Sequence, residues 1–325
     1  MAQYSAPSPA LKRVLEPTGL TVSPLCLGCA PLGDMADTFG YSVPDAQALE
    51  TFRAALSGPI NFIDNAASYG DGEAERRLGI VLAEMGGLPE GYVVATKADR
   101  DPQTGDFSGE QMRRSVERSL RLLGLDYIQI VHLHDPEHST WEQITAPDGA
   151  IETLLDLKRE GVIGYIGLAG GPADLMQRYV ETDAFDLLVT HNRYTLLNRS
   201  GSALIDAAAA RGMGVLNAAP YGSGLLAKGP DSGARYVYQE APPEVLEQAR
   251  ALDAVCRRYD VPLGAAALQF SMRDPRITST VVGMTKPERI QQTVEWASYA
   301  IPDDLWTDLA AIGHSTQDPE ASRWG

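Results

Sequence analysis

The chain has 325 residues, of which 44% are hydrophobic and 22% charged, the composition of a globular protein that can bury a large core. Lys and Arg total 27 against 43 Asp and Glu, so the formal net charge is -16 at pH 7. A chain this acidic does not hold nucleic acid or an anionic membrane by general electrostatics, and any anionic ligand needs a local basic patch.

The cysteines and the first residues favour a soluble cytoplasmic protein. Cys26, Cys29 and Cys256 are scattered and odd in number, so they predict neither a disulfide framework nor a zinc site. Residues 1–14 lack the apolar core of a secretory signal, and no uncharged apolar run approaches the length of a membrane span. We therefore expect no membrane and no nucleic-acid partner; the oligomeric state stays open.

Short apolar or β-branched runs alternate with longer stretches of helical period, which is typical of a parallel sheet covered by helices. Several helices begin with Asp, Ser or Pro, as caps or first-turn residues. Strands are predicted, in chain order, over 23–28, 61–66, 92–97, 127–134, 165–170, 187–192, 214–220 and 279–284. Helices are predicted over 45–57, 72–85, 109–123, 149–160, 172–181, 201–211, 243–259 and 286–299.

This repeat favours a closed (β/α)8 TIM barrel over an open doubly wound sheet. The segment 28–40, after the first strand, continues into neither a GxGxxG turn nor a helix. We expect one domain over residues 1–325, with about 15 residues at each end peripheral. Long polar segments (99–108, 135–149 and 223–243) follow the third, fourth and seventh strands. All three therefore lie on the carboxyl face of the barrel, where such folds place their active sites.

Four polar residues fall at or just beyond the ends of consecutive strands. Asp64 and Tyr69 follow the second strand, Lys97 ends the third and His134 ends the fourth. Because neighbouring strands of a barrel end at one rim, we expect these side chains to share a pocket.

The combination suits proton transfer to and from a carbonyl oxygen. A phenol with a pKa near 10 exchanges protons slowly at neutral pH, but a nearby Lys cation favours its phenolate form. Asp64 would keep Lys97 charged, Tyr69 would act as acid and base, and His134 would donate a hydrogen bond to the substrate oxygen.

Each residue also has a structural explanation. Asp64 is a possible cap, Lys97 a solvated charge or ion pair, Tyr69 a packing residue of its turn, and His134 a histidine satisfied by its own turn. Four polar placements at one rim are not what core packing selects, and their coincidence favours the functional interpretation.

The segments FIDNAASYGDGEAERRLG (62–79), VVATK (93–97), LGLDYIQIVHLHDPE (123–137) and GVIGYIGLAG (161–170) resemble the aldo-keto reductase superfamily. With AAPYGSGLLA (218–227) and NRYTLLN (192–198), the chain looks like the branch of bacterial aldose 1-dehydrogenases, L-fucose and L-galactose dehydrogenases and pyridoxal 4-dehydrogenase.

The resemblance runs from about Leu20 to Trp296 and implies roles for the four rim residues. Tyr69 would be the proton donor or acceptor, Lys97 and Asp64 would tune it, and His134 would orient the substrate.

A second histidine, His132, lies two residues before His134 and so points to the same face of its strand. The family's His-Asp-Pro turn aligns with His134, so His132 is expected deeper among the inward side chains. An HxH pair also occurs in metal-dependent barrel hydrolases, but usually on the first strand and with ligands from later strands, where His191 is the only histidine. We predict no metal.

Superfamily members hold nicotinamide cofactor with loops and helix ends after the later strands. Backbone amides in the first such loop and the free N–H groups and cations at the start of the last helix would bind pyrophosphate and adenosine phosphate. Lys286 and Arg289 are equally compatible with an exposed first turn; Arg289 matches a position that often meets the 2′-phosphate, so NADP is favoured over NAD. The candidate cofactor residues are Asn192, Tyr221, Ser223, Gly224, Leu225, Gly283, Thr285, Lys286 and Arg289.

The chain departs from the family pattern around the nicotinamide. Ala169 and Gly170 stand where Ser-Asn is common, His191 where Gln is usual, Ala218 at the stacking aromatic and Thr293 at a common Asn. Asn192 or Tyr221 would then supply the carboxamide contacts.

The leading hypothesis is NAD(P)-dependent oxidation of an aldose to a lactone, or the reverse type of reaction on an aldehyde or ketone. Asp34, His138 and Trp141, in loops after the first and fourth strands, are candidates for recognising substrate hydroxyls. Two alternatives stay open: a nucleotide-sensing binding protein on the same barrel, and the metal-dependent hydrolase.

Overall fold

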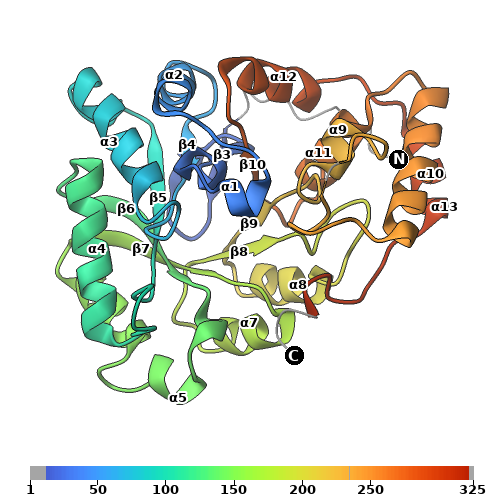
Figure 1. Ribbon diagram of the computed structural model, residues 1–325. Helices are drawn as coiled ribbons and strands as arrows, with labels where there is room; N and C mark the ends of the chain where they lie inside the picture. Colours follow the sequence, from blue (N-terminus) through green and yellow to red (C-terminus); the bar gives the residue numbers. More distant parts are fainter. Residues whose placement is uncertain (1–11, 234, 322–325) are drawn as a thin grey trace.

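The computed structural model describes residues 12–233 and 235–321. Within these ranges, eight parallel strands close into a barrel in the order β10-β3-β4-β5-β6-β7-β8-β9. Helices surround the strands on the outside (Figure 1). The predicted (β/α)8 barrel is confirmed.

Every predicted strand range overlaps one strand of the barrel, although β5 ends one residue later and β7 begins two residues earlier than predicted. Alternate residues point inward, where Phe62, Ile130, Val189 and Leu216 help to form a buried apolar cluster. The strands are β3 Leu25–Gly28, β4 Phe62–Asp64, β5 Val93–Ala98, β6 Ile128–His134, β7 Ile163–Ala169, β8 Leu187–His191, β9 Gly214–Ala218 and β10 Ser279–Gly283.

The predicted helices are also present and pack on the barrel through their apolar faces. In α4, for example, Met112, Val116 and Leu123 are buried, and the Ser108 side chain caps the first turn by accepting the Gln111 N–H. These helices are α2 Asp45–Ala55, α3 Glu73–Met85, α4 Gly109–Leu123, α6 Ala150–Arg159, α7 Ala173–Val180, α8 Ser202–Ala210, α10 Pro243–Arg258 and α12 Pro287–Ala297.

Two further long helices are absent from the sequence prediction. In α11 (Leu263–Met272) every residue except Phe270 is buried, so the helix has no polar face to reveal its period. The last long helix, α13 (Asp303–Ile312), lies against α10 on the outside of the molecule (Figure 1). Shorter elements in the loops are η1 Ala30–Gly33, α1 Ala36–Phe39, η2 Pro136–His138, α5 Trp141–Ile144 and α9 Leu225–Lys228. No helix in the described ranges is both long and apolar enough to cross a bilayer.

A small antiparallel hairpin, β1 (Arg13–Leu15) and β2 (Leu20–Val22), closes the amino end of the barrel. Leu15 and Val22 join the apolar cluster inside the strands. The Tyr165 hydroxyl donates to the Thr18 carbonyl in the hairpin turn at 2.6 Å. These two short strands lie outside the strand–helix repeat and show no readable alternation, which is why the sequence pattern does not predict them.

The segment that follows α13 returns to the barrel and is held by a buried arginine. Arg193, which is 0% exposed, donates to both carboxylate oxygens of Asp318 and, at 2.8 Å, to Glu320, which is 2% exposed. Glu320 also lies 3.0 Å from Nε2 of His191, at the carboxyl end of β8. The sequence pattern predicts a peripheral C-terminal stretch, whereas Asp318 and Glu320 are bound to residues at the rim of the barrel. Residues 322–325 and 1–11 fall outside the described ranges.

Arg193→Met should lower the free energy of unfolding by about 3 kcal/mol, because it removes the guanidinium that pairs with the buried Glu320 carboxylate. Urea unfolding measures the change. The matched control is Arg257→Met on α10, whose side chain is 77% exposed and should matter by less than about 0.5 kcal/mol. Equal losses in the two variants would contradict a structural role for the buried pair.

Candidate active site

The four residues expected to share one pocket do lie together. Asp64, Lys97 and His134 come from the neighbouring strands β4, β5 and β6, and Tyr69 from the loop after β4. The Lys97 Nζ lies 2.7 Å from Oδ2 of Asp64 and 2.8 Å from the Tyr69 oxygen. The Tyr69 and His134 rings meet edge to face, with centroids 5.9 Å apart.

The Lys97 ammonium uses all of its hydrogen-bonding capacity. Besides Asp64 and Tyr69 it donates to the main-chain oxygen of Asn65 at 2.7 Å. An ammonium group has three donors and no acceptor, so the Tyr69 oxygen must be the acceptor in this contact. The phenolic hydrogen is therefore left for another partner.

Burial decides the ionisation of Tyr69. Burial raises the pKa of the phenol above its ordinary value, and the positive charge of Lys97 opposes the rise without cancelling it. Burial alone lowers the pKa of Lys97, but Asp64 and Tyr69 outweigh it and raise that pKa. The charge of Lys97 thus lowers the phenol pKa, as expected from the sequence, but burial outweighs it. The resting pair is therefore an ammonium and a neutral phenol.

Two glycines fix the turn that carries Tyr69. Gly70 has φ +63°, and a Cβ there would lie 1.9 Å from the Gly33 carbonyl oxygen. A Cβ on Gly33 would in turn lie 2.7 Å from the Tyr69 carbonyl. The Arg77 guanidinium holds the η1 side of this contact by donating to the Leu32 carbonyl at 2.7 Å. The backbone of one loop therefore determines where the phenol stands.

His134 is held by an acid that the sequence pattern did not single out. Its Nδ1 lies 2.7 Å from Oδ1 of Asp99, whose other oxygen accepts the Ser68 N–H at 2.9 Å. Burial lowers the pKa of His134, but Asp135 and Asp99 outweigh it and raise the value to about 9. Asp99 follows Lys97 by two residues, so strand periodicity places both on one face and was a usable signal.

His132 lies below this group, as expected from the sequence. It is 0% exposed, both ring nitrogens lack a hydrogen-bond partner, and burial lowers its pKa well below the ordinary value. Gly167 on β7 leaves room for the ring, because a Cβ there would lie 1.8 Å from Nδ1. Across residues 12–233 and 235–321, no group of three or more His, Cys, Asp and Glu side chains is arranged to hold a metal ion.

Buried polar atoms without partners lie beyond the later strands, where a cofactor is expected. Asn192 follows β8 with φ 57°, is 0% exposed, and neither its amide oxygen nor its nitrogen has a hydrogen-bond partner. The Tyr221 hydroxyl is also buried and unpaired, and its ring meets Trp296 edge to face. Buried polar groups rarely stay unpaired, so these atoms suit a polar ligand.

A further unpaired oxygen belongs to Glu137 on η2. Its Oε1 accepts the Gly171 N–H at 2.8 Å, while Oε2 is buried without a partner. A Cβ on Gly170 would lie 2.8 Å from this oxygen. The carboxyl group thus stands beside a position that has no side chain, and burial raises its pKa to about 7.

The loop after β9 has the tight conformation expected of an anion-binding turn. Ser223 and Gly224 have φ 61° and 96° and precede α9, whose first residue Leu225 is buried. The Ser223 hydroxyl accepts the Tyr238 N–H at 2.8 Å, so it also anchors the rest of the loop.

The segment after β10 lies beside this loop. Gly283 ends β10, the Thr285 carbonyl accepts the Gln47 amide at 2.8 Å, and Lys286 precedes α12. The charge of Arg289 acts on Tyr221, where it lowers the phenol pKa against the stronger effect of burial. The Arg289 side chain is exposed at the start of α12 and donates to Gln292.

A bridge that the sequence did not reveal crosses the end of β10. Arg235 donates to the carbonyl oxygens of Asp37 and Thr38 at 3.0 and 2.9 Å, and Phe39 meets Tyr238 edge to face. The loops after β9 and β3 are joined in this way, and β10 lies between those two strands.

The three expected substrate residues have different surroundings. Asp34 accepts from the Ser42 hydroxyl and the Val43 N–H, so its Oδ1 holds its own loop together. Trp141 stacks on Tyr179 with centroids 4.8 Å apart.

His138 interacts electrostatically with His134 and Asp99 of the site. Burial lowers its pKa, Arg100 lowers it further, and the carboxylates of Asp135 and Asp99 act on it in the opposite direction.

The chain matches the model of the Aldo/keto reductase family over residues 24–314. It is 32% identical to a D-threo-aldose 1-dehydrogenase of Pseudomonas sp over 318 residues, covering 90% of this chain and 94% of the relative. It is also 32% identical to an L-galactose dehydrogenase of Arabidopsis thaliana, with 92% and 93% covered, and 31% identical to a pyridoxal 4-dehydrogenase of Microbacterium luteolum, with 93% and 97% covered.

A solved aldo-keto reductase of Bacillus halodurans, in its holo form, has the same fold, with a TM-score of 0.77 at 24% identity over 96% of this chain and 99% of that one. The resemblance read from the motifs is confirmed. Family membership removes the hydrolase alternative. The barrel is closed, the motif residues gather at its rim, and the family match spans most of the sequence. The chain therefore belongs to the aldo/keto reductase family and is an oxidoreductase.

Proposed function

We propose that the protein catalyses NAD(P)-dependent oxidation of an aldose at its anomeric carbon to a lactone, or the reverse type of reaction on a small aldehyde or ketone. The contact between the Lys97 ammonium and the Tyr69 oxygen, 2.8 Å, is the observation that carries this proposal. The names of the relatives, D-threo-aldose 1-dehydrogenase and L-galactose dehydrogenase, support the substrate class. The protein would act as a single domain in the cytoplasm.

Tyr69 would transfer the proton. Its oxygen accepts from Lys97, so its own hydrogen is available to a substrate carbonyl oxygen at the barrel mouth. In the oxidative direction the same oxygen would take the hydroxyl proton, and Lys97 would stabilise the phenolate that precedes this step. A bound nicotinamide would take or supply the hydride.

His134 would hold the substrate oxygen. Asp99 accepts from Nδ1, and a pKa of about 9 keeps the second ring nitrogen protonated at neutral pH. That Nε2–H would donate to the oxygen on which negative charge develops, which stabilises the transition state more than the ground state.

The residues beyond β8, β9 and β10 fit a dinucleotide. The unpaired amide of Asn192 and hydroxyl of Tyr221 would bind the nicotinamide end, with Glu137 as a further acceptor for an amide N–H. Ser223 and Gly224 would hold the pyrophosphate, while Arg289 at the start of α12 would meet an adenosine phosphate, which favours NADP over NAD.

Tyr69→Phe should lower turnover about 100- to 10,000-fold, because the phenolic proton is lost while the ring remains. Absorbance of reduced nicotinamide, followed over a panel of aldoses and aldehydes, gives the rate, and calorimetry with NADP checks that nucleotide binding is unchanged. Tyr127→Phe, whose side chain is exposed at the start of β6, is the matched control. Absence of turnover by the wild type with both nucleotides would contradict the proposed oxidoreductase activity on these substrates.

Asp99→Asn should lower the pKa of His134 from about 9 toward its ordinary value, since it removes one of the two carboxylates that raise it. Nitrogen NMR of the ring measures the titration. The pKa of His134 is higher in the folded than in the unfolded protein, so protonation of this ring stabilises the fold. This contribution, on the order of 3 kcal/mol, is complete below about pH 6.5 and is lost as the pH rises through 9. The unfolding free energy of the variant should fall less across this window.

Asp304→Asn on α13 is the control for this titration. Titration of His134 near pH 6.5 in the wild type would contradict the prediction that its ring is protonated at neutral pH.

Arg289→Gln should raise the KM for NADP about 10-fold or more, since one charge-assisted contact is lost, and leave the KM for NAD within twofold. Steady-state kinetics with both nucleotides measures the ratio, and Arg257→Gln serves as the control. Parallel changes for the two nucleotides would show that Arg289 does not contact the 2′-phosphate.

A further inference from the structure

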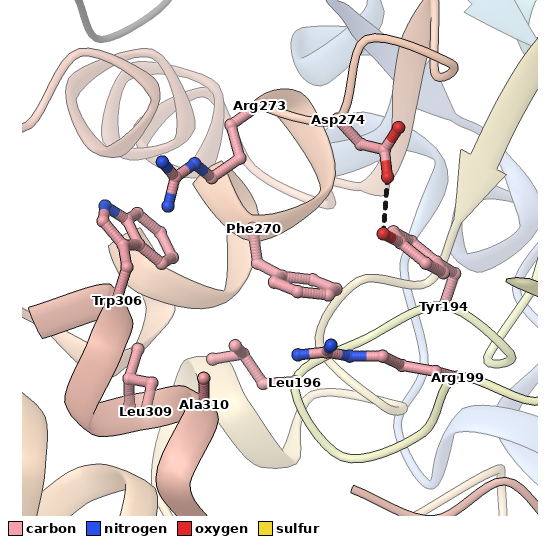
Figure 2. Close-up of a pocket in the computed structure, with 9 residues that line it drawn as sticks. All are labelled: Tyr194, Leu196, Arg199, Phe270, Arg273, Asp274, Trp306, Leu309 and Ala310. Atoms are coloured by element: carbon pink, nitrogen blue, oxygen red, sulfur yellow. Dashed lines mark hydrogen bonds between the residues drawn. The ribbon is translucent and has the colours of Figure 1, made fainter. Parts of the chain in front are cut away.

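A second hollow opens on the outer wall of the barrel, away from the tetrad on β4, β5 and β6. The outer pocket has a volume of about 210 Å³ and lies between α11, α13 and the loop after β8. None of its residues belongs to the catalytic or cofactor set. Its lining, drawn in Figure 2, is Tyr194, Leu196, Arg199, Phe270, Arg273, Asp274, Trp306, Leu309 and Ala310.

Aromatic rings and guanidinium groups alternate around this space. Tyr194 stacks on Phe270 with centroids 5.1 Å apart, and the guanidinium carbon of Arg199 lies 4.8 Å from the Phe270 centroid. On the opposite wall Arg273 lies 4.3 Å from the Trp306 ring centre. In Figure 2 Arg199 reaches beneath Phe270 toward the middle of the pocket. Flat apolar surfaces are thus presented together with positive charge.

The one acid in the lining does not pair with Arg199. Asp274 accepts from the Tyr194 hydroxyl at 2.5 Å and from the Arg276 guanidinium at 2.6 and 2.9 Å. Burial alone would raise its pKa, but Arg276 and Tyr194 hold that pKa below the ordinary value. The carboxylate is therefore ionised and already paired within the wall.

Arg199 has a donor that the protein does not satisfy. Its Nε is buried and has no hydrogen-bond partner. The terminal nitrogens of Arg199 point toward the middle of the pocket (Figure 2), and a carboxylate is the acceptor whose geometry matches the guanidinium fork. The net charge of -16 makes this local basic surface unusual for the chain, because general attraction of anions is unfavourable.

We propose that the outer pocket binds a small aromatic carboxylate. Its carboxylate would meet Arg199, its ring would lie against the aromatic walls, and the volume suits a ligand the size of a single substituted ring. The site does not depend on nucleotide or on the oxidoreductase reaction.

Benzoate is the probe, titrated by calorimetry into the nucleotide-free protein with benzamide, acetate and inorganic phosphate in parallel. Saturable binding of benzoate, at least 10-fold tighter than that of its neutral isostere benzamide and tighter than that of acetate or phosphate, is expected. Equal binding of benzamide removes the role of charge, and equal binding of acetate or phosphate removes the role of the flat ring. Either result, or no saturable binding, overturns the proposal.

Substitutions of single residues test whether benzoate binds in the outer pocket. Arg199→Gln should weaken benzoate binding at least 10-fold, and Arg199→Lys, which keeps the charge but lacks the fork, should weaken it less. Arg257→Gln should have no effect, and thermal unfolding checks that each variant is folded. His134→Asn should also leave binding unchanged; a loss there would assign the carboxylate to the barrel mouth and overturn the outer site.

Crystals grown with 4-bromobenzoate provide a direct location. The bromine anomalous signal is expected between Phe270 and Trp306. A signal only at the carboxyl face of the barrel would contradict the proposal even if the titrations agreed with it.

Discussion

The buried ammonium of Lys97 is the constraint on which the rest of the site depends. A charge inside a barrel is tolerated only when its hydrogens are accepted, because the cost of removing it from water is several kcal/mol. Here the acceptors are a carboxylate from the next strand, a main-chain oxygen and a phenol, all within 2.8 Å. Tyr69 is therefore more than a neighbour of the lysine; it completes the solvation of a charge that would otherwise be unsatisfied.

A second ion pair stands beside the first and has a different consequence. Lys97 and Tyr69 rest as a cation and a neutral acid, while Asp99 and Asp135 keep His134 protonated to about pH 9. The Tyr69 and His134 rings, with centroids 5.9 Å apart, thus place an O–H donor and an N–H donor near one another at the rim of the barrel. This polarity suits an oxygen that gains negative charge, and it is produced locally, in a chain whose overall charge is strongly negative.

Described segments near the two ends of the chain pack against opposite faces of the barrel. The hairpin of β1 and β2 packs Leu15 and Val22 into the amino end, whereas Asp318 and Glu320 are tied to Arg193 on the carboxyl side. Glu320 pairs with His191, at the carboxyl end of β8, so the segment after α13 contributes to the surroundings of the site. The loop that carries Arg193 also carries Arg199 of the outer pocket.

Sequence alone determined the eight strand and helix repeats, the closed barrel and the set of Asp64, Tyr69, Lys97 and His134. Alternating polarity and strand ends are local features, and adjacent parallel strands bring such residues to one rim whatever the loops do. Only the tertiary structure decided the rest: α11, buried on nearly all sides, the Asp99 partner of His134, the Arg235 bridge and the docking of Glu320. Each of these depends on contacts between segments far apart in the chain. Strand periodicity puts Asp99 on the same face as Lys97, but no pattern within a segment identifies the partner that a side chain meets.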